Sequence, residues 1–120
     1  MKSVLYMISQ TPYSNNHSFE LIESAMVGAI FDLKVSILYR EDGVWSLVSK
    51  QNGDLQNTKT YSKVISGLST YEIDRIYFCE QSVEARRIDV NDLFPDARPL
   101  KINEQKELIS HQDIVMAGPK

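Results

Sequence analysis

Short apolar segments alternate with segments of helical periodicity along this chain, and no other feature of the sequence constrains the fold as strongly. The first three apolar segments cover residues 4–8, 34–39 and 74–79. All three are short and rich in β-branched and aromatic residues, which is typical of strands buried on both faces of a sheet. Because strands that alternate with helices form βαβ units, the sequence predicts a mainly parallel sheet covered by helices on both faces.

Two segments between these strands show the helical period. In the first, the apolar residues fall at helical spacing: Phe19, Ile22, Met26, Ala29, Ile30 and Leu33. Ser18 is the predicted N-cap of this helix, because a serine oxygen accepts a hydrogen bond from the first turn. The second stripe consists of Tyr61, Val64, Ile65 and Leu68, and it follows a polar loop over residues 50–58. A short apolar piece over residues 44–48 carries the only tryptophan, Trp45.

The sequence pattern in the last third of the chain predicts shorter elements. They are a helix over residues 80–87, an irregular connection over 89–99, a strand over 100–102, a helix over 104–110 and a strand over 113–116. A chain of 120 residues is long enough for one hydrophobic core and too short for two ordinary domains. We therefore predict a single α/β domain over residues 1–120, a three-layer α/β/α sandwich around a mainly parallel five-stranded sheet.

Charge and cysteine content narrow the classes of function. The net charge is −3 and the basic residues are scattered, so we expect no direct contact with nucleic acid, which needs a concentrated basic face. A single cysteine cannot form an internal disulfide, which favours a reducing compartment. No segment approaches the ~20 apolar residues that span a bilayer, and the first apolar run is too short for a signal peptide. We therefore expect a cytoplasmic protein without a membrane segment.

Cys79 closes the third strand and directly precedes a predicted helix, and whether its sulfur reacts or is only packed is the question on which the function depends. Reactive groups of parallel α/β folds gather at the carboxyl ends of the strands, and the N–H groups of a helix start favour a thiolate. Arg86, seven residues further on, would also lower the pKa of the thiol, whereas Glu80 would raise it. The alternative is a structural role, since free cysteine is among the most buried residue types.

Other sites common in α/β proteins fit the sequence poorly. The polar loop over residues 9–16 has no glycine with which to cradle a phosphate, which argues against a flavin mononucleotide site. A phospho-receiver domain needs acidic residues where this chain has Ser9, Gln10 and Cys79. His17 and His111 lie far apart without further ligands at metal-binding spacing, so we expect neither a metal nor a cofactor. A Cys–His nucleophile pair stays open, without positive support.

Several motifs, taken in order and spacing, resemble the DsrE/DsrF-like sulfur-relay family. They are Glu20-Leu21-Ile22-Glu23-Ser24-Ala25, Val35 to Tyr39 with Asp42-Gly43-Val44, Leu68 with Tyr71-Glu72-Ile73, and Cys79 followed by Ser82 and Arg86-Arg87. The resemblance covers nearly the whole chain and is greatest to the TusC/DsrF-type subunit. It implies an α/β/α sandwich that assembles with homologous TusB/DsrH-type and TusD/DsrE-type subunits into a heterohexamer.

The resemblance also implies a role for Cys79, which matches the sulfur-accepting cysteine of the TusD/DsrE-type subunit. Three departures indicate a supporting role in this chain: Ile88 replaces a frequent glycine, Glu80 replaces a small or apolar residue, and the loop after Pro12 lacks the glycines of relatives. Cys79 is therefore the candidate auxiliary sulfur carrier, and Arg86 and Arg87 are candidate stabilisers of its anion.

The function implied by the resemblance is that of a TusC-like subunit of a cytoplasmic sulfur relay. Such a relay delivers persulfide sulfur, through a downstream acceptor protein, for 2-thiolation of the wobble uridine of tRNA. Two alternatives stay open. One is a DsrF-like subunit of a sulfur-oxidation complex, and the other is a stand-alone small-molecule-binding α/β domain that uses the loop over residues 9–16.

Overall fold

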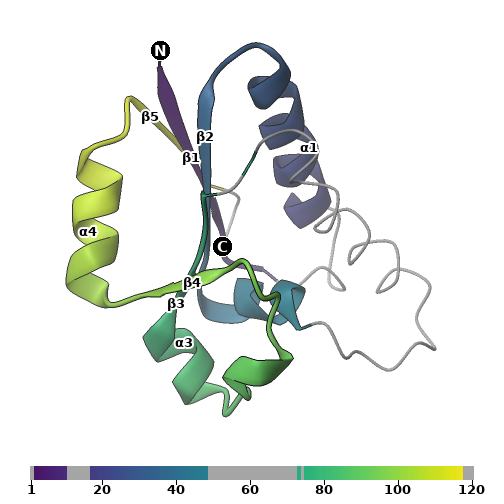
Figure 1. The fold of residues 1–120 in the computed structure, drawn as a ribbon, viewed down its shortest axis with the longest axis vertical. Helices are drawn as coiled ribbons and strands as arrows, with labels where there is room; N and C mark the ends of the chain where they lie inside the picture. Colours follow the sequence, from purple (N-terminus) through teal and green to yellow (C-terminus); the bar gives the residue numbers. More distant parts are fainter. Residues whose placement is uncertain (1, 11–16, 49–72, 74, 118–120) are drawn as a thin grey trace.

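A computed structural model describes residues 2–10, 17–48, 73 and 75–117 (Figure 1). The predicted polar loop over residues 50–58 and the helical stripe from Tyr61 to Leu68 lie outside the described residues. Within the described part, no helix is long and apolar enough to cross a membrane.

Five strands form one sheet, and every pairing between them is parallel. They are β1 (Ser3–Ile8), β2 (Lys34–Tyr39), β3 (Arg75–Cys79), β4 (Arg98–Leu100) and β5 (Ile114–Ala117), in the order β4-β3-β2-β1-β5. The predicted parallel five-stranded sheet is thus confirmed. The fourth strand lies two residues earlier than predicted and contains Pro99. A proline lacks the N–H that a central strand must donate, but β4 pairs only with β3 in this sheet and tolerates it.

The sheet separates two apolar clusters, because successive side chains of a strand point to opposite faces. The larger cluster includes Val4, Tyr6, Ile8, Ile37, Tyr39, Ile76 and Phe78, together with Ala25 of α1 (His17–Ile30). The smaller cluster consists of Leu5, Met7 and Leu38, and Leu108 and Ile109 of α4 (Ile102–Ser110) pack against it. The helices α1 and α4 lie on opposite sides of the sheet in Figure 1, which confirms the three-layer architecture.

Two helix starts differ from the sequence prediction. α1 begins at His17, so Ser18 lies inside the helix and is not its N-cap. α4 begins at Ile102, two residues before the predicted start, with Lys101 as the preceding residue. There the side chain of Glu104 accepts a hydrogen bond of 2.8 Å from the Lys101 N–H, which stabilises an earlier first turn.

Two short helices follow strands at the carboxyl edge of the sheet, η1 (Glu41–Leu47, a 3₁₀ helix) after β2 and α3 (Glu80–Ala85) after β3. α3 ends two residues earlier than predicted because Arg87 adopts a left-handed φ of 53°. The N–H groups of Arg87 and Ile88 then bond the carbonyls of Glu84 and Val83, which closes the helix in a Schellman motif.

The backbone of Gly43 brings η1 against the end of β1. A Cβ atom at this position would overlap the carbonyl oxygen of Ile8, so only glycine fits. The predicted apolar piece around Trp45 belongs to η1, where Val44 and Leu47 are buried and Trp45 is partly exposed. The ends of β1 and β2 and the start of η1 therefore form one close-packed corner beside β3.

Candidate functional site

Cys79 is the last residue of β3 and immediately precedes α3, as the sequence predicted. The residue is buried, with 3% of its surface exposed. It pairs in register with Leu100 of β4, and Tyr77, which lies on the same face of β3, packs with Leu100 against the cluster beneath α4. The thiol therefore lies at the carboxyl edge of the sheet on the α4 side.

Hydrogen bonds lower the pKa of this buried thiol. Burial raises the pKa of Cys79, since a thiolate is poorly solvated in the protein interior. Four hydrogen bonds outweigh that effect: they come from the side chains of Ser82 and Gln105 and from the backbone N–H groups of Ser82 and Gln81. The net result is a pKa below the ordinary value of a thiol, which favours the nucleophilic form.

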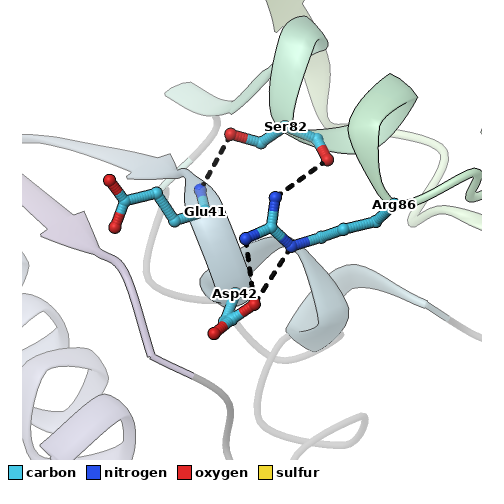
Figure 2. A network of polar contacts seen from close by, with 4 residues as sticks. All are labelled: Glu41, Asp42, Ser82 and Arg86. Atoms are coloured by element: carbon cyan, nitrogen blue, oxygen red, sulfur yellow. Dashed lines mark hydrogen bonds and ion pairs between the residues drawn. The ribbon is translucent and has the colours of Figure 1, made fainter.

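The hydroxyl group of Ser82 is oriented by the backbone of another element. Figure 2 shows that the N–H of Glu41 donates to Ser82 Oγ, with a distance of 2.9 Å. Glu41 has a left-handed φ of 51° at the start of η1. Because the oxygen already accepts this bond, the hydroxyl hydrogen is free to point at the sulfur of Cys79, where Ser82 acts as a donor.

The two arginines predicted as anion stabilisers lie in different surroundings. Arg86 Nε and Nη2 donate to Asp42 Oδ1 at 3.0 and 2.9 Å, and Nη1 donates to the carbonyl of Ser82 at 3.2 Å (Figure 2). Arg86 thus joins α3 to η1. Arg87 is exposed at the end of α3. Neither is among the described groups that hydrogen-bond the sulfur, so their role toward the anion stays a prediction.

Arg40 is a further cation at this edge of the sheet. The register of β2 and β3, continued by one residue, places Arg40 beside Cys79 on the same face. Its Nε donates to Ser9 Oγ at 3.4 Å, and its N–H donates to the carbonyl of Ile8 at 3.0 Å. Sequence reasoning missed Arg40, although its position directly after a strand was a usable signal.

Gln105 is the second residue that sequence reasoning missed. It lies one turn before Leu108 and Ile109, the residues through which α4 contacts the sheet. Helical spacing could therefore have placed Gln105 on the buried face, but no local signal connects it with Cys79, 26 positions earlier. Among the residues that the structure describes, no three His, Cys, Asp or Glu side chains group closely enough to hold a metal ion.

Comparisons with known proteins agree on one family. The profile of the DsrE/DsrF-like family matches residues 2–117. The chain is 33% identical over 93 residues to the intracellular sulfur oxidation protein DsrF of Allochromatium vinosum, covering 78% of this chain and 68% of that protein. It is 22% identical over 117 residues to the protein TusC of Shigella flexneri, covering 97% of this chain and 98% of that protein.

Solved structures share the fold at low sequence identity. The ychN protein of Escherichia coli superposes with a TM-score of 0.80 at 16% identity, covering 98% of this chain and all of that one. The protein MTH1491 of Methanobacterium thermoautotrophicum superposes with a TM-score of 0.74 at 14% identity. Since the family profile extends over nearly the whole chain and the fold agrees, the chain belongs to the DsrE/DsrF-like family.

Proposed function

We propose that this protein is a TusC/DsrF-type subunit of a cytoplasmic sulfur-relay complex and that Cys79 is its auxiliary sulfur carrier. The observation that supports the carrier role is the position of Cys79 at the carboxyl end of β3, directly before α3, where hydrogen bonds lower the pKa of the thiol despite its burial. Membership of the DsrE/DsrF-like family and relatives named DsrF and TusC support the relay role.

The chemistry proposed for Cys79 is a transfer of sulfur from one thiol to another. The Cys79 thiolate attacks the terminal sulfur of a donor persulfide, R–S–SH. The S–S bond of the donor breaks, the donor leaves as R–S⁻, and Cys79 becomes a persulfide. A thiol with a pKa near the ambient pH is best suited to this exchange, because it is both ionised and nucleophilic.

The burial of Cys79 supports an auxiliary role. A thiol with 3% of its surface exposed meets a protein donor only when the surrounding segments separate or when a partner subunit rearranges them. The subunit then serves mainly to hold a homologous sulfur-carrying subunit in place. We propose partners of the TusB/DsrH and TusD/DsrE types in a heterohexamer.

The sulfur is proposed to pass, through a downstream acceptor protein, to the wobble uridine of tRNA, where it forms 2-thiouridine. Full-length similarity to proteins named TusC supports this destination. A second candidate is a subunit of a sulfur-oxidation complex, which the 33% identity to DsrF favours. Expression of the chain in a bacterium that lacks its own TusC separates the two, with 2-thiouridine in tRNA as the readout. Restored 2-thiouridine supports the tRNA pathway, and no restoration despite assembly with the host partners supports the second candidate.

Assembly is tested by co-expression with homologous partner subunits from the same genome. We expect a stable complex of all three chains in size-exclusion chromatography and native mass spectrometry. A monomer that binds neither partner would contradict the relay proposal and favour a stand-alone small-molecule-binding domain.

Sulfur transfer is tested with Cys79→Ser in the same complex. After incubation with a persulfide donor, intact-mass spectrometry should show one added sulfur atom on the wild-type chain and none on the variant. We expect Cys79→Ser to assemble normally and to lower sulfur delivery only in part. Complete loss of delivery with normal assembly would make Cys79 the principal carrier, and unchanged delivery with no sulfur on the wild-type chain would remove its carrier role.

A further inference from the structure

The polar side chain of Gln105 occupies the buried face of an otherwise exposed helix. Of the nine residues of α4, all of which the structure describes, Gln105 alone is buried, with 5% of its surface exposed. A leucine or methionine at this position would extend the apolar contacts of Leu108 and Ile109. Burial of an amide is unfavourable unless its hydrogen-bonding groups are satisfied. The side chain of Gln105 therefore needs hydrogen bonds that offset the free-energy cost of its burial.

The amide nitrogen of Gln105 connects two neighbouring strands. Nε2 donates to the carbonyl oxygen of Leu100 at 3.0 Å, and a hydrogen bond from the same side chain is among the causes that lower the pKa of the Cys79 thiol. Leu100 and Cys79 are register partners of β4 and β3, so the two acceptors lie side by side. A glutamine amide has two N–H groups, which is the number that these acceptors require.

We propose that Gln105 is a positioning residue for Cys79, which fixes the sulfur from α4 and favours the release of sulfur from its persulfide. The proposed effect on sulfur release rests on the proposed carrier function of Cys79. The proposed effect of Gln105 on the pKa of the thiol does not. The bond to Leu100 holds the amide in place beside the register partner of Cys79, which leaves the second N–H for the sulfur.

In the release step, a nucleophile attacks the terminal sulfur of the Cys79 persulfide. The S–S bond breaks, the terminal sulfur leaves with the nucleophile, and Cys79 is released as a thiolate. A leaving thiolate of lower pKa departs faster. The Gln105 N–H strengthens its bond to the sulfur as negative charge develops there, so it accelerates release more than it stabilises the loaded state.

Several charged residues also lie in the segments at this edge of the sheet. They are Glu80 on α3, Arg40 after β2, and Lys101 and Glu104 at the start of α4. Replacement of Gln105 by methionine leaves all of these charges in place. A change in the titration of Cys79 therefore reports the loss of the amide N–H.

The test uses the full-length protein with ¹³Cβ-labelled cysteine. Because the chain has a single cysteine, the labelled resonance reports only Cys79, and its pH titration needs no reagent to enter the site. Gln105→Met keeps the length of the side chain without its donor, and we expect the titration midpoint to rise. The matched control is Gln112→Met, which removes a glutamine that donates to the Leu108 carbonyl and should leave the midpoint unchanged.

Release is measured by cyanolysis after loading with inorganic polysulfide. Cyanide takes the terminal sulfur as thiocyanate and leaves the Cys79 thiolate. We expect thiocyanate formation to be roughly threefold slower in Gln105→Met than in Gln112→Met, because the leaving thiolate is less stabilised.

The outcomes separate this inference from the proposed function. An unchanged titration midpoint in folded Gln105→Met overturns the positioning role. If that variant does not fold, the same titration is measured in Gln105→Asn, whose side chain is one methylene shorter. An unchanged midpoint in Gln105→Asn then overturns the positioning role. A wild-type chain that never takes up sulfur overturns the carrier function, while the titration still decides the role of Gln105.

Discussion

Ser82 and Gln105 belong to different helices, and both lower the pKa of the Cys79 thiol, which supports the proposed role of this residue. Ser82 comes from α3 directly after the cysteine, whereas Gln105 comes from α4. The sequence predicted the position of Cys79, because a strand end before a helix is visible in local patterns. It could not predict the donors, since a hydroxyl or an amide becomes a donor to sulfur only when the fold brings it there.

Replacement of Ser82 by alanine should reduce the thiolate fraction of Cys79 near neutral pH. The variant loses a hydroxyl donor that lowers the pKa of the thiol, so the pKa should rise. We expect alkylation by iodoacetamide at pH 7 to slow by roughly fivefold, because hydrogen bonds to charged groups are among the stronger ones. Ser110→Ala is the control, since that hydroxyl bonds the Glu107 carbonyl on α4. Equal rates in the two variants would show that the Ser82 hydroxyl does not act on the sulfur.

At the scale of elements, the sequence predicted type and order well and predicted ends poorly. The helix after Cys79 was expected to continue to residue 87, but the left-handed backbone of Arg87 ends it at Ala85. Helix ends of this kind usually carry glycine, so an arginine gave no signal. Pro99 similarly concealed the start of β4, because a proline is acceptable there only in a strand with this place in the sheet.

Arg87→Gly should stabilise the protein, because glycine adopts a left-handed φ without steric cost. The expected gain in the free energy of unfolding is ~1 kcal/mol, measured by urea denaturation. Ala85→Gly, in the last helical position of α3, should lower it by ~1 kcal/mol, since its backbone is helical there. A loss of stability in Arg87→Gly would mean that the guanidinium contributes more than the backbone strain costs.

Gly43 of η1 and Gly28 of α1 should respond to alanine in opposite directions. In Gly43→Ala the new methyl group meets the Ile8 carbonyl oxygen, and we expect a loss of ~1–3 kcal/mol from overpacking. In Gly28→Ala the nearest atom is Leu33 Cδ1 at 3.4 Å, so the helix preference of alanine should stabilise α1 by ~0.5–1 kcal/mol. Thermal unfolding of both variants checks the pair, and similar midpoints would contradict the packing described at the corner of η1.

At the scale of the whole molecule, the alternation of strands and helices was sufficient to predict the architecture. Parallel strands leave only a few ways to connect, so patterns such as residues 4–8 and 34–39 determine much of the fold. For the site, the sequence predicted only its location at the carboxyl edge of the sheet. The contact of Ser82 with Glu41 joins residues 41 positions apart in the sequence, and that of Gln105 with Cys79 joins residues 26 positions apart, so both follow from packing alone.

The lowered pKa of Cys79 should make the stability of the molecule depend on pH. The folded state has the lower pKa, so between the folded and the unfolded pKa the unfolded state binds more protons. Stability from this group is therefore fully present above the unfolded pKa and is lost as the pH falls through the folded pKa. The free energy of unfolding of the wild type should rise relative to Cys79→Ser as the pH increases across this window. Urea denaturation of both proteins at several pH values measures the difference in their free energies of unfolding. A difference that does not change with pH would contradict the lowered pKa.

The parallel course of β1 and β5 also determines where a fusion partner can be attached. Ser3 lies at the amino ends of the parallel strands, whereas Cys79 lies at their carboxyl ends. Ala117, the last residue of β5, also lies at the carboxyl ends. A purification tag at the amino end thus begins on the side away from the thiol. A fluorophore attached at Ala117 lies on the side of the thiol, where it can report the arrival of a sulfur donor.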